Sequence, residues 1–516
     1  MKKLLPLLLL LTLISGPLLV CAQVVDNQVN GEQELSNKNY KAALDDFTKA
    51  IGERNNSDKI KQAYLYYRLA VCQAALNDKG AAYKSYETSL SLNPKLRTAY
   101  WDRGVLYESD NNYILALADY HNAILNSKPW DGEMEILYAN VAYCQYRLGQ
   151  YTEAMRADSQ AMALNNNYGR AYLIRGNIYL ATKKYKLASD DYTTAMFKYG
   201  PDMKMITLLY TDRAEAKMRL GKTKDAINDY SLAIKLDTTT TRIAYWNRGA
   251  AYHKNGDYQL ASNDYTKAIA FYQGDDKNLS KLYNDRAMNE LGLNHFSNAI
   301  ADDSLAITYD ATNVYAYLYQ AITYTQSAEY QKAIYDYHSV IILKHDDKGF
   351  LARIYYQVAS DEYFLNEFDK VIGDCTKAIT YDPGYSEAYY YRAKVYMKKM
   401  KDKGLAAKDF DKVLSLDTTK KSVSYVFSLL YTGKSDEAVS ILQNDLLHAD
   451  ENVRVTGDYY NLACLYAILN QPEEANSYLK KAMDNGYSKK YAITDEDLDN
   501  IRNTDDYKAT IASAAN

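Results

Sequence analysis

The sequence predicts an all-α protein that repeats one motif of two helices. Residues that break helices are scarce, because 22 glycines and 7 prolines among 516 residues are about half of the average share. A tyrosine followed four positions later by a small residue recurs along the chain, as in Tyr100/Gly104 and Tyr172/Gly176. A second pattern with spacings of three and four follows each of these pairs. Both spacings place residues on one face of a helix.

Residues 1–22 predict a secretory signal peptide. Lys2 and Lys3 precede a short apolar run, and a small-residue cleavage sequence ends this segment. The run is shorter than the ~20 residues that a membrane-spanning helix needs. A second interpretation is a bacterial lipoprotein, because residues 18–21 resemble its cleavage box and would leave a lipid on Cys21. We therefore expect an exported protein, periplasmic or secreted, which contacts a membrane only if Cys21 is lipidated.

Composition excludes some partners and crosslinks. The formal net charge is −4, which supplies no basic surface for nucleic acid. The four cysteines that follow residue 22 fall in different helical units, and no CxxC motif occurs. We expect them to be small buried core residues and not disulfide partners; they are Cys72, Cys144, Cys375 and Cys464.

The first helix of each unit is followed by a turn with Gly or Asn and then by the second pattern, as in Tyr113-x-x-Ala116-x-x-x-Tyr120-x-x-Ala123. Together these residues resemble the tetratricopeptide repeat, a helix pair of about 34 residues. The resemblance covers residues 23–486 in about thirteen units, one of them degenerate near residues 420–450. It implies a right-handed superhelical solenoid of antiparallel helix pairs, in which small residues let the two helices of a unit approach closely.

Residues 487–516 follow the last unit. The stretch from Asp495 to Arg502 is polar, and it resembles the C-terminal end of many bacterial proteins of this family. Terminal units of a repeat array must shield its core. We therefore expect C-terminal capping helices here.

The spacing of the small residues has a longer period than one unit. The step from Gly104 to Ala142 is 38 residues and the step from Ala142 to Gly176 is 34, and this alternation continues, so the period is about 72 residues. The four additional residues correspond to about one helical turn. Duplication of a two-unit ancestor explains the alternation, and a docking ridge along one edge is the alternative.

Six first helices carry an arginine directly before the small residue, and the second helix of each of these units carries an aspartate. Charges that are partly buried need partners. We predict ion pairs within units, and the alternative is a row of ligand-binding arginines. The pairs are Arg103 with Asp119, Arg175 with Asp191, Arg213 with Asp229, Arg248 with Asp264, Arg286 with Asp302, and Arg392 with Asp409.

First helices are expected to line a long concave groove. Large, weakly charged rings there would suit an extended peptide or an amphipathic helix. Ordinary packing between units is the other interpretation of each residue, and stacking of sugar rings in a cell-wall polysaccharide is the alternative function. The family's carboxylate clamp for acidic C-terminal tails is missing from these positions. The candidate groove residues are Tyr67, Trp101, Tyr143, Tyr146, Leu173, Trp246, His253, Tyr356, Tyr363, Tyr390 and Tyr460.

No catalytic pattern occurs in the sequence. The six histidines are scattered, and neither a phosphate-binding loop nor a nucleophile elbow is present. Acidic connections such as Asp275-Asp276 and Asp346-Asp347 fit helix caps better than calcium loops. We therefore predict no enzyme, no metal and no cofactor. The sequence indicates an exported scaffold of the bacterial cell envelope that binds a protein or peptide whose identity it does not specify.

Overall fold

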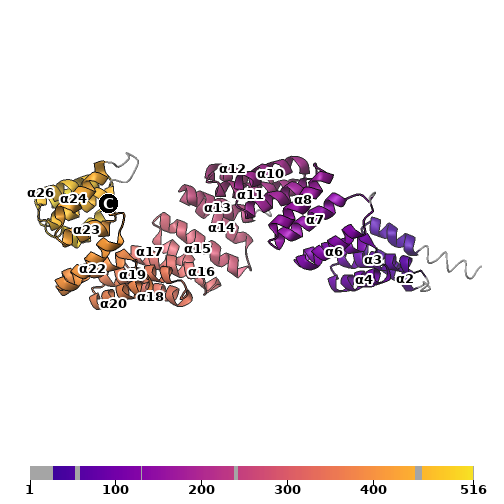
Figure 1. Ribbon diagram of the computed structural model, residues 1–516, viewed down its shortest axis with the longest axis horizontal. Coiled ribbons are helices and arrows are strands. Elements are labelled where there is room, and N and C mark those ends of the chain that lie inside the picture. Colours follow the sequence, from indigo (N-terminus) through magenta and orange to yellow (C-terminus); the bar gives the residue numbers. More distant parts are fainter. Residues whose placement is uncertain (1–26, 53–57, 129–130, 238–241, 448–455, 515–516) are drawn as a thin grey trace, which may run out of the picture. The chain divides into compact units, whose positions relative to one another are not determined.

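The computed structural model describes residues 27–52, 58–128, 131–237, 242–447 and 456–514. The predicted signal peptide and Cys21 lie outside these residues. The described part of the chain is helical and has no β-strand, which confirms the all-α prediction. Figure 1 follows the helices along the chain from indigo to yellow.

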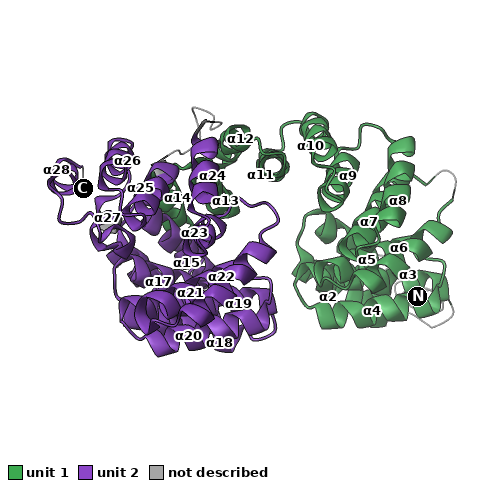
Figure 2. Cartoon of the chain, turned by 60° about the vertical axis from the view of Figure 1, so that its left-hand side comes forward, with its two compact units in different colours: residues 1–268 green, residues 269–516 purple. Residues whose placement is uncertain are grey.

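The chain divides into two compact units, residues 1–268 and residues 269–516, which Figure 2 colours green and purple. Unit 1 contains consecutive helix pairs. They are residues 27–36 with α2 (Tyr40–Gly52), α3 (Lys59–Ala75) with α4 (Lys79–Leu92), α5 (Arg97–Ser109) with α6 (Tyr113–Leu125), α7 (Met134–Arg147) with α8 (Tyr151–Leu164), α9 (Gly169–Ala181) with α10 (Tyr185–Tyr199), α11 (Met203–Arg219) with α12 (Thr223–Leu236), and α13 (Arg242–Asn255) with α14 (Tyr258–Phe271).

Unit 2 continues the same pattern, and α14 ends just inside it. Its pairs are α15 (Asp276–Gly292) with α16 (Phe296–Tyr309), α17 (Val314–Gln326) with α18 (Tyr330–Leu343), α19 (Lys348–Phe364) with α20 (Phe368–Tyr381), α21 (Ser386–Val395) and its extension η1 (Tyr396–Met400) with α22 (Lys403–Leu416), α23 (Val423–Tyr431) with α24 (Ser435–Leu447), and α25 (Thr456–Ile468) with α26 (Pro472–Asp484). The pairs match the about thirteen units that the sequence predicts.

Contact between a small residue and a buried ring holds the two helices of a unit together. A Cβ atom added to Gly176 on α9 would lie 2.7 Å from the ring of Tyr192 on α10. Tyr192 is completely buried. Gly104 faces Tyr120 in the same way at 2.8 Å. The small residue is therefore required because an aromatic ring occupies the space of its side chain.

The turns between the two helices of a unit also follow the sequence. Gly149 after α7 has a φ of 76° and Gly221 after α11 has a φ of 75°. The backbone N–H of Gln150 donates to the carbonyl of Gln145 at 2.9 Å, and that of Gly149 donates to Tyr146 at 3.0 Å. This pair of bonds closes the helix in a Schellman motif.

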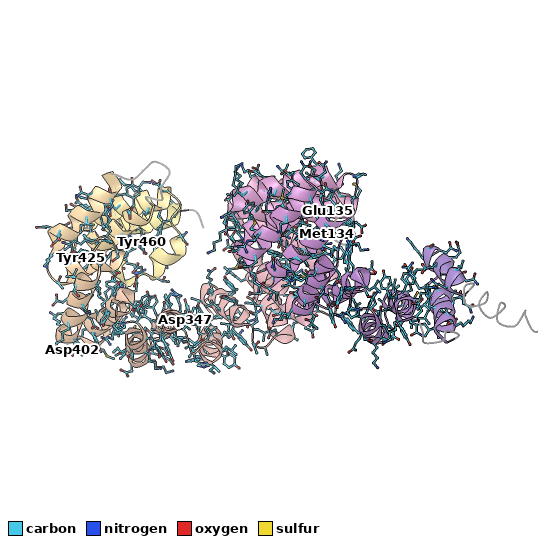
Figure 3. The ribbon with its side chains drawn as sticks, turned by 45° about the vertical axis from the view of Figure 1, so that its right-hand side comes forward. Met134, Glu135, Asp347, Asp402, Tyr425 and Tyr460 are labelled. Carbon is cyan, nitrogen blue, oxygen red and sulfur yellow. The ribbon has the colours of Figure 1, made fainter. Side chains whose placement is uncertain are left out.

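The 72-residue alternation has a structural counterpart in the first helices. Helices α11, α15 and α19 have 17 residues each, whereas α9 and α17 have 13. Each long helix begins after an aspartate whose side chain accepts a hydrogen bond from a backbone N–H three residues later, namely Asp202, Asp275 and Asp347. Asp347, which directly precedes α19 in the sequence, is labelled in Figure 3. The acidic connections are therefore helix caps, as predicted.

The C-terminal end adds a different element to unit 2. The degenerate repeat still forms a helix pair, although its first helix, α23, has only 9 residues. After α26 the chain forms α27 (Lys489–Thr494), η2 (Glu496–Leu498) and α28 (Asp505–Ser513). Leu498, Ile501 and Tyr507 join the apolar core that α25 and α26 build.

Candidate functional site

First helices of neighbouring repeats contact one another directly. In unit 1 these contacts join α3 to α5, α7 to α9 and α11 to α13, and in unit 2 they join α15 to α17, α21 to α23 and α23 to α25. We call the side of each unit that these helices form its first-helix surface. It is the surface on which the sequence places the candidate binding residues.

The six arginine–aspartate pairs predicted from the sequence are all present in the structure. Arg103 donates to both carboxylate oxygens of Asp119, from Nε at 2.7 Å and from Nη2 at 2.8 Å. The aspartates are 3–7% exposed. The same two-bond geometry occurs between Arg175 and Asp191, Arg213 and Asp229, Arg248 and Asp264, Arg286 and Asp302, and Arg392 and Asp409.

Three of these arginines also connect their repeat to the one before it. Arg248 donates from Nη1 to the hydroxyl of Ser231 on α12 at 2.9 Å. Arg213 does the same with Thr193 at 3.0 Å, and Arg392 with Thr376 at 2.8 Å. A guanidinium group engaged on both edges holds the framework together, which argues against a row of ligand-binding arginines.

In unit 1 the candidate binding residues other than Tyr67 are only partly buried. Trp101 on α5 lies under the guanidinium group of Arg97, whose Cζ atom is 4.9 Å from the ring centroid. The ring of Tyr143 on α7 lies between two other tyrosines. Its centroid is 6.2 Å from that of Tyr113 and 6.4 Å from that of Tyr146. The partly buried set on the first-helix surface of unit 1 comprises Trp101, Tyr143, Tyr146, Leu173, Trp246 and His253.

An ion pair spans this surface from one first helix to the next but one. Arg170 on α9 donates to Glu108 on α5 at 3.3 Å. Its guanidinium carbon is 5.8 Å from the ring centroid of Tyr143 on α7, which lies between the two helices in sequence. Glu108 also accepts a hydrogen bond from Tyr120 at 2.7 Å. The side chains of three successive first helices therefore meet at one place.

The sequence did not single out two carboxyl groups on this surface, those of Asp102 and Asp212. Burial and the nearby charge of Glu215 raise the pKa of Asp212 on α11 to about 7. Burial also raises the pKa of Asp102 on α5. Both aspartates lie two positions before the small residue of their unit, and this shared position is the signal that could have found them. Glu215 also lines a cavity of about 290 Å³, together with Met218, Arg219, Tyr230, Asn247, Ala250 and Lys254.

The structure corrects two of the candidate binding residues. Tyr67 is 8% exposed and Tyr460 is 5% exposed, so neither offers an open ring. Tyr67 donates to Asp102 of the next first helix at 2.9 Å. Tyr460 on α25, labelled in Figure 3, donates to Asp495 at 2.8 Å and stacks on Tyr487 at 3.9 Å between centroids. Packing between neighbouring elements explains both residues.

The other three candidates in unit 2 are engaged within the chain. Tyr356 makes edge contacts with two rings, Tyr385 at 5.5 Å and Tyr391 at 5.6 Å. Tyr363 donates to Glu496 of η2 at 2.8 Å. Tyr390 lies 6.1 Å from Phe410 on α22. All three are partly buried, as the unit 1 candidates are, and burial raises the pKa of each.

The cysteines follow the prediction, since all four are buried and unpaired. Burial raises the pKa of Cys144 to about 12, which keeps its thiol protonated. Within the described ranges, no group of three His, Cys, Asp or Glu side chains is arranged to hold a metal ion. No described helix combines the length and the apolar character that crossing a membrane requires.

Family models of the tetratricopeptide repeat match residues 63–96, 211–276 and 459–484. The protein carries tetratricopeptide repeats. The matched stretches fall on α3 and α4, on α11 to α14, and on α25 and α26, so they sample both units.

This chain spans only part of the length of the curated relatives that it matches. Human DnaJ homolog subfamily C member 7 is 24% identical over 307 residues, which cover 57% of this chain and 56% of that protein. The Hsp70-Hsp90 organizing protein of Triticum aestivum is 26% identical over 167 residues, which cover 32% of this chain and 26% of that protein. A solved C-terminal part of a repeat protein from Cytophaga hutchinsonii is 19% identical, with a TM-score of 0.42, and covers 49% of this chain and 98% of its own.

Proposed function

We propose that the protein is an exported, non-enzymatic scaffold of the cell envelope that binds protein or peptide partners on the first-helix surface of unit 1. The observation that carries this proposal is a set of aromatic side chains on the first helices of unit 1. Trp101, Tyr143, Tyr146 and Trp246 all stay partly exposed there. Rings held on a rigid framework offer contact area at a small entropic cost.

Polar groups give this surface directionality. Asp102, Glu108 and Arg170 lie among the rings, and Glu215 lines the cavity at α11, α12 and α13. A backbone segment of a partner could therefore pack on the rings while its polar groups meet these side chains. Two of the curated relatives are a DnaJ homolog and an Hsp70-Hsp90 organizing protein, and the second name describes a protein that acts on other proteins.

Crosslinking tests this proposal directly. A photoreactive amino acid at Trp101 or at Trp246 should capture protein partners in cells, and mass spectrometry should identify them. The matched control is Phe197 on the second helix α10, which is 82% exposed and lies away from the first-helix positions. Capture that is equal at all three positions, or absent at Trp101 and Trp246, contradicts the proposal.

The same variants separate proteins from glycans as partners. The purified protein is tested for saturable binding to cell-wall polysaccharide. If it binds, and if Trp101→Ala and Trp246→Ala abolish the binding, the protein is a sugar-binding module and not a protein scaffold. Export is tested by the mass of the mature N-terminus. A chain that begins at Gln23 indicates cleavage of residues 1–22, a lipid on Cys21 indicates a lipoprotein, and an intact Met1 contradicts export.

A further inference from the structure

Residues 495–497 of the C-terminal end lie on the first-helix surface of unit 2. The carboxylate of Glu496 accepts hydrogen bonds from Tyr363 on α19 at 2.8 Å and from Lys399 on η1 at 2.5 Å. Tyr363 is 133 residues away from Glu496 along the chain. This short acidic segment therefore reaches back over several repeats and covers part of the first-helix surface of unit 2.

Three lysines and three tyrosines surround the segment. Lys394 donates to Asp497 at 3.0 Å, and Lys398 donates to the other oxygen of the same carboxylate. Tyr431 on α23 donates to Asp497 at 3.4 Å. Tyr460 on α25 donates to Asp495. Donors from α19, α21, η1, α23 and α25 thus converge on three consecutive carboxylates.

Burial makes these contacts strong. The side chain of Asp497 is 8% exposed, and those of Lys394 and Lys398 are 18% and 21% exposed. Burial alone would raise the pKa of Asp497, but Lys394 and Lys398 hold it below its usual value. The three lysines would repel one another without the acidic segment, because like charges this close interact strongly in a low dielectric. The site is therefore built for anionic side chains.

The backbone around two of the lysines is unusual. Helix α21 ends in a π-helical segment over residues 396–400, which contains Lys398 and Lys399. Single π-helical turns inside helices occur frequently at functional sites. In this chain the wider turn brings Lys398 and Lys399 to adjacent carboxylates of the segment.

We propose that this part of the first-helix surface of unit 2 is a binding site for an acidic partner segment, and that residues 495–497 occupy it internally in the free protein. The occupant has the form of adjacent acidic side chains followed by a leucine, since Leu498 directly after the segment is completely buried. Recognition uses side-chain carboxylates inside a chain and needs no terminal carboxylate. The inference rests on the proposed scaffold function and names the chemistry of a second partner.

Exchange of the segment can be measured with a labelled synthetic peptide of residues 492–503 and the full-length protein. Glu496→Gln/Asp497→Asn removes the internal competitor's charge, and Asp505→Asn/Asp506→Asn on α28 is the matched control with the same change in charge. We expect the first variant to bind the peptide at least about tenfold more tightly than the wild type and the control, because the competent state becomes more populated. Lys398→Gln/Lys399→Gln in that background should remove most of the gain.

A second measurement uses the wild-type protein and does not depend on any variant. Excess unlabelled peptide should increase hydrogen exchange in residues 495–504 while α21 and α22 keep their protection, and a peptide with amides in place of its carboxylates should not. Equal peptide affinity of all variants, or unchanged exchange in the wild type, overturns the proposal. Either failure leaves crosslinking at Trp101 and Trp246 of unit 1 unaffected, so it is distinguishable from failure of the scaffold function.

Discussion

The repeats α13/α14 and α17/α18 place an aspartate at the same position but differ in its partner. In the first repeat, Arg248 donates twice to Asp264 and once to Ser231 of the preceding repeat. In the second, Gln320 takes the place of the arginine, and its Nε2 donates to Ser304 of the preceding repeat at 2.8 Å. Gln320 thus preserves the bond between repeats but leaves Asp336 without the guanidinium group.

The consequence for the carboxyl group is large. One carboxylate oxygen of Asp336 is buried without a hydrogen-bond partner, and burial raises the pKa of Asp336 to about 7. The neighbouring first helix α19 adds Asp361, whose pKa burial also raises to about 7 although Thr325 donates to it. The comparison teaches that the arginine compensates for burying the aspartate, and that repeats without it become sensitive to pH.

Among the variants that test this comparison, removal of Arg248 should change local stability the most. Arg248→Met leaves Asp264, which is 3% exposed, without its partner. Breaking a buried pair in this way costs about 3–5 kcal/mol. Hydrogen exchange of α13 and α14 at pH 8 should report this loss of local stability. The double variant Arg248→Met/Asp264→Leu should recover most of it, and a single variant as stable as the wild type would show that the pair contributes nothing.

The pH dependence of α17 to α20 should be the next largest effect. Because the pKa of Asp336 rises from 3.8 to about 7 on folding, the folded protein binds more protons than the unfolded chain between these values. Local stability should therefore fall as pH rises from 4 to 7, by about 1.4 kcal/mol per pH unit for each such group. Hydrogen exchange across this range measures the slope. Asp336→Asn should reduce it, Asp336→Asn/Asp361→Asn should reduce it further, and a flat wild-type profile contradicts the prediction.

An arginine introduced at position 320 should give the α17/α18 repeat the ion pair that the α13/α14 repeat has. Gln320→Arg places a guanidinium group between Ser304 and Asp336, as Arg248 lies between Ser231 and Asp264. A hydrogen bond to a charged group contributes about 1.5–3 kcal/mol, so we expect a gain of about 1.5 kcal/mol at pH 8 and a smaller gain at pH 5. Thermal unfolding at both pH values tests this. Gln320→Leu, which loses the bond to Ser304, should destabilise the protein at both.

The smallest effect concerns glycines in the two kinds of repeat. Gly373 lies inside α20, in a repeat without the arginine, and an added Cβ atom would have no neighbour within 4 Å. Gly373→Ala should therefore stabilise the protein by about 0.5–1 kcal/mol through helix propensity alone. Gly176→Ala in the Arg175 repeat is the contrasting variant, because its Cβ atom would meet the ring of Tyr192 and should lower the melting temperature. Equal shifts for both variants would contradict this account.

Much of the fold was predictable because its determinants are local. Arg103 and Asp119 are 16 residues apart, on two helices joined by one tight turn, so the sequence already brings them together. The buried tyrosines Tyr120, Tyr192 and Tyr230 occupy one repeating position, which explains part of the excess of tyrosine among the aromatic residues. Helix caps such as Asp275 are determined within a single turn.

Exposure was harder to predict, and the candidate site shows why. Tyr67 and Trp101 occupy the same position in neighbouring repeats, yet Tyr67 is buried and hydrogen-bonded to Asp102 while Trp101 stays partly exposed. Whether a first-helix ring is covered depends on the side chains of the next repeat. Periodicity assigns a residue to a face of a helix but does not say what covers that face.

The sequence by itself determined the repeat, its period, the helix caps and the ion pairs within units, because each depends on residues one or two helices apart. Only the tertiary structure decided which first-helix positions remain open and that residues 495–497 lie against Tyr363 and Lys394. These contacts join residues about a hundred or more positions apart, as with Lys394 and Asp497 at a separation of 103. Such pairs follow from how successive repeats stack, since small rotations accumulate along the array and no local pattern encodes their sum.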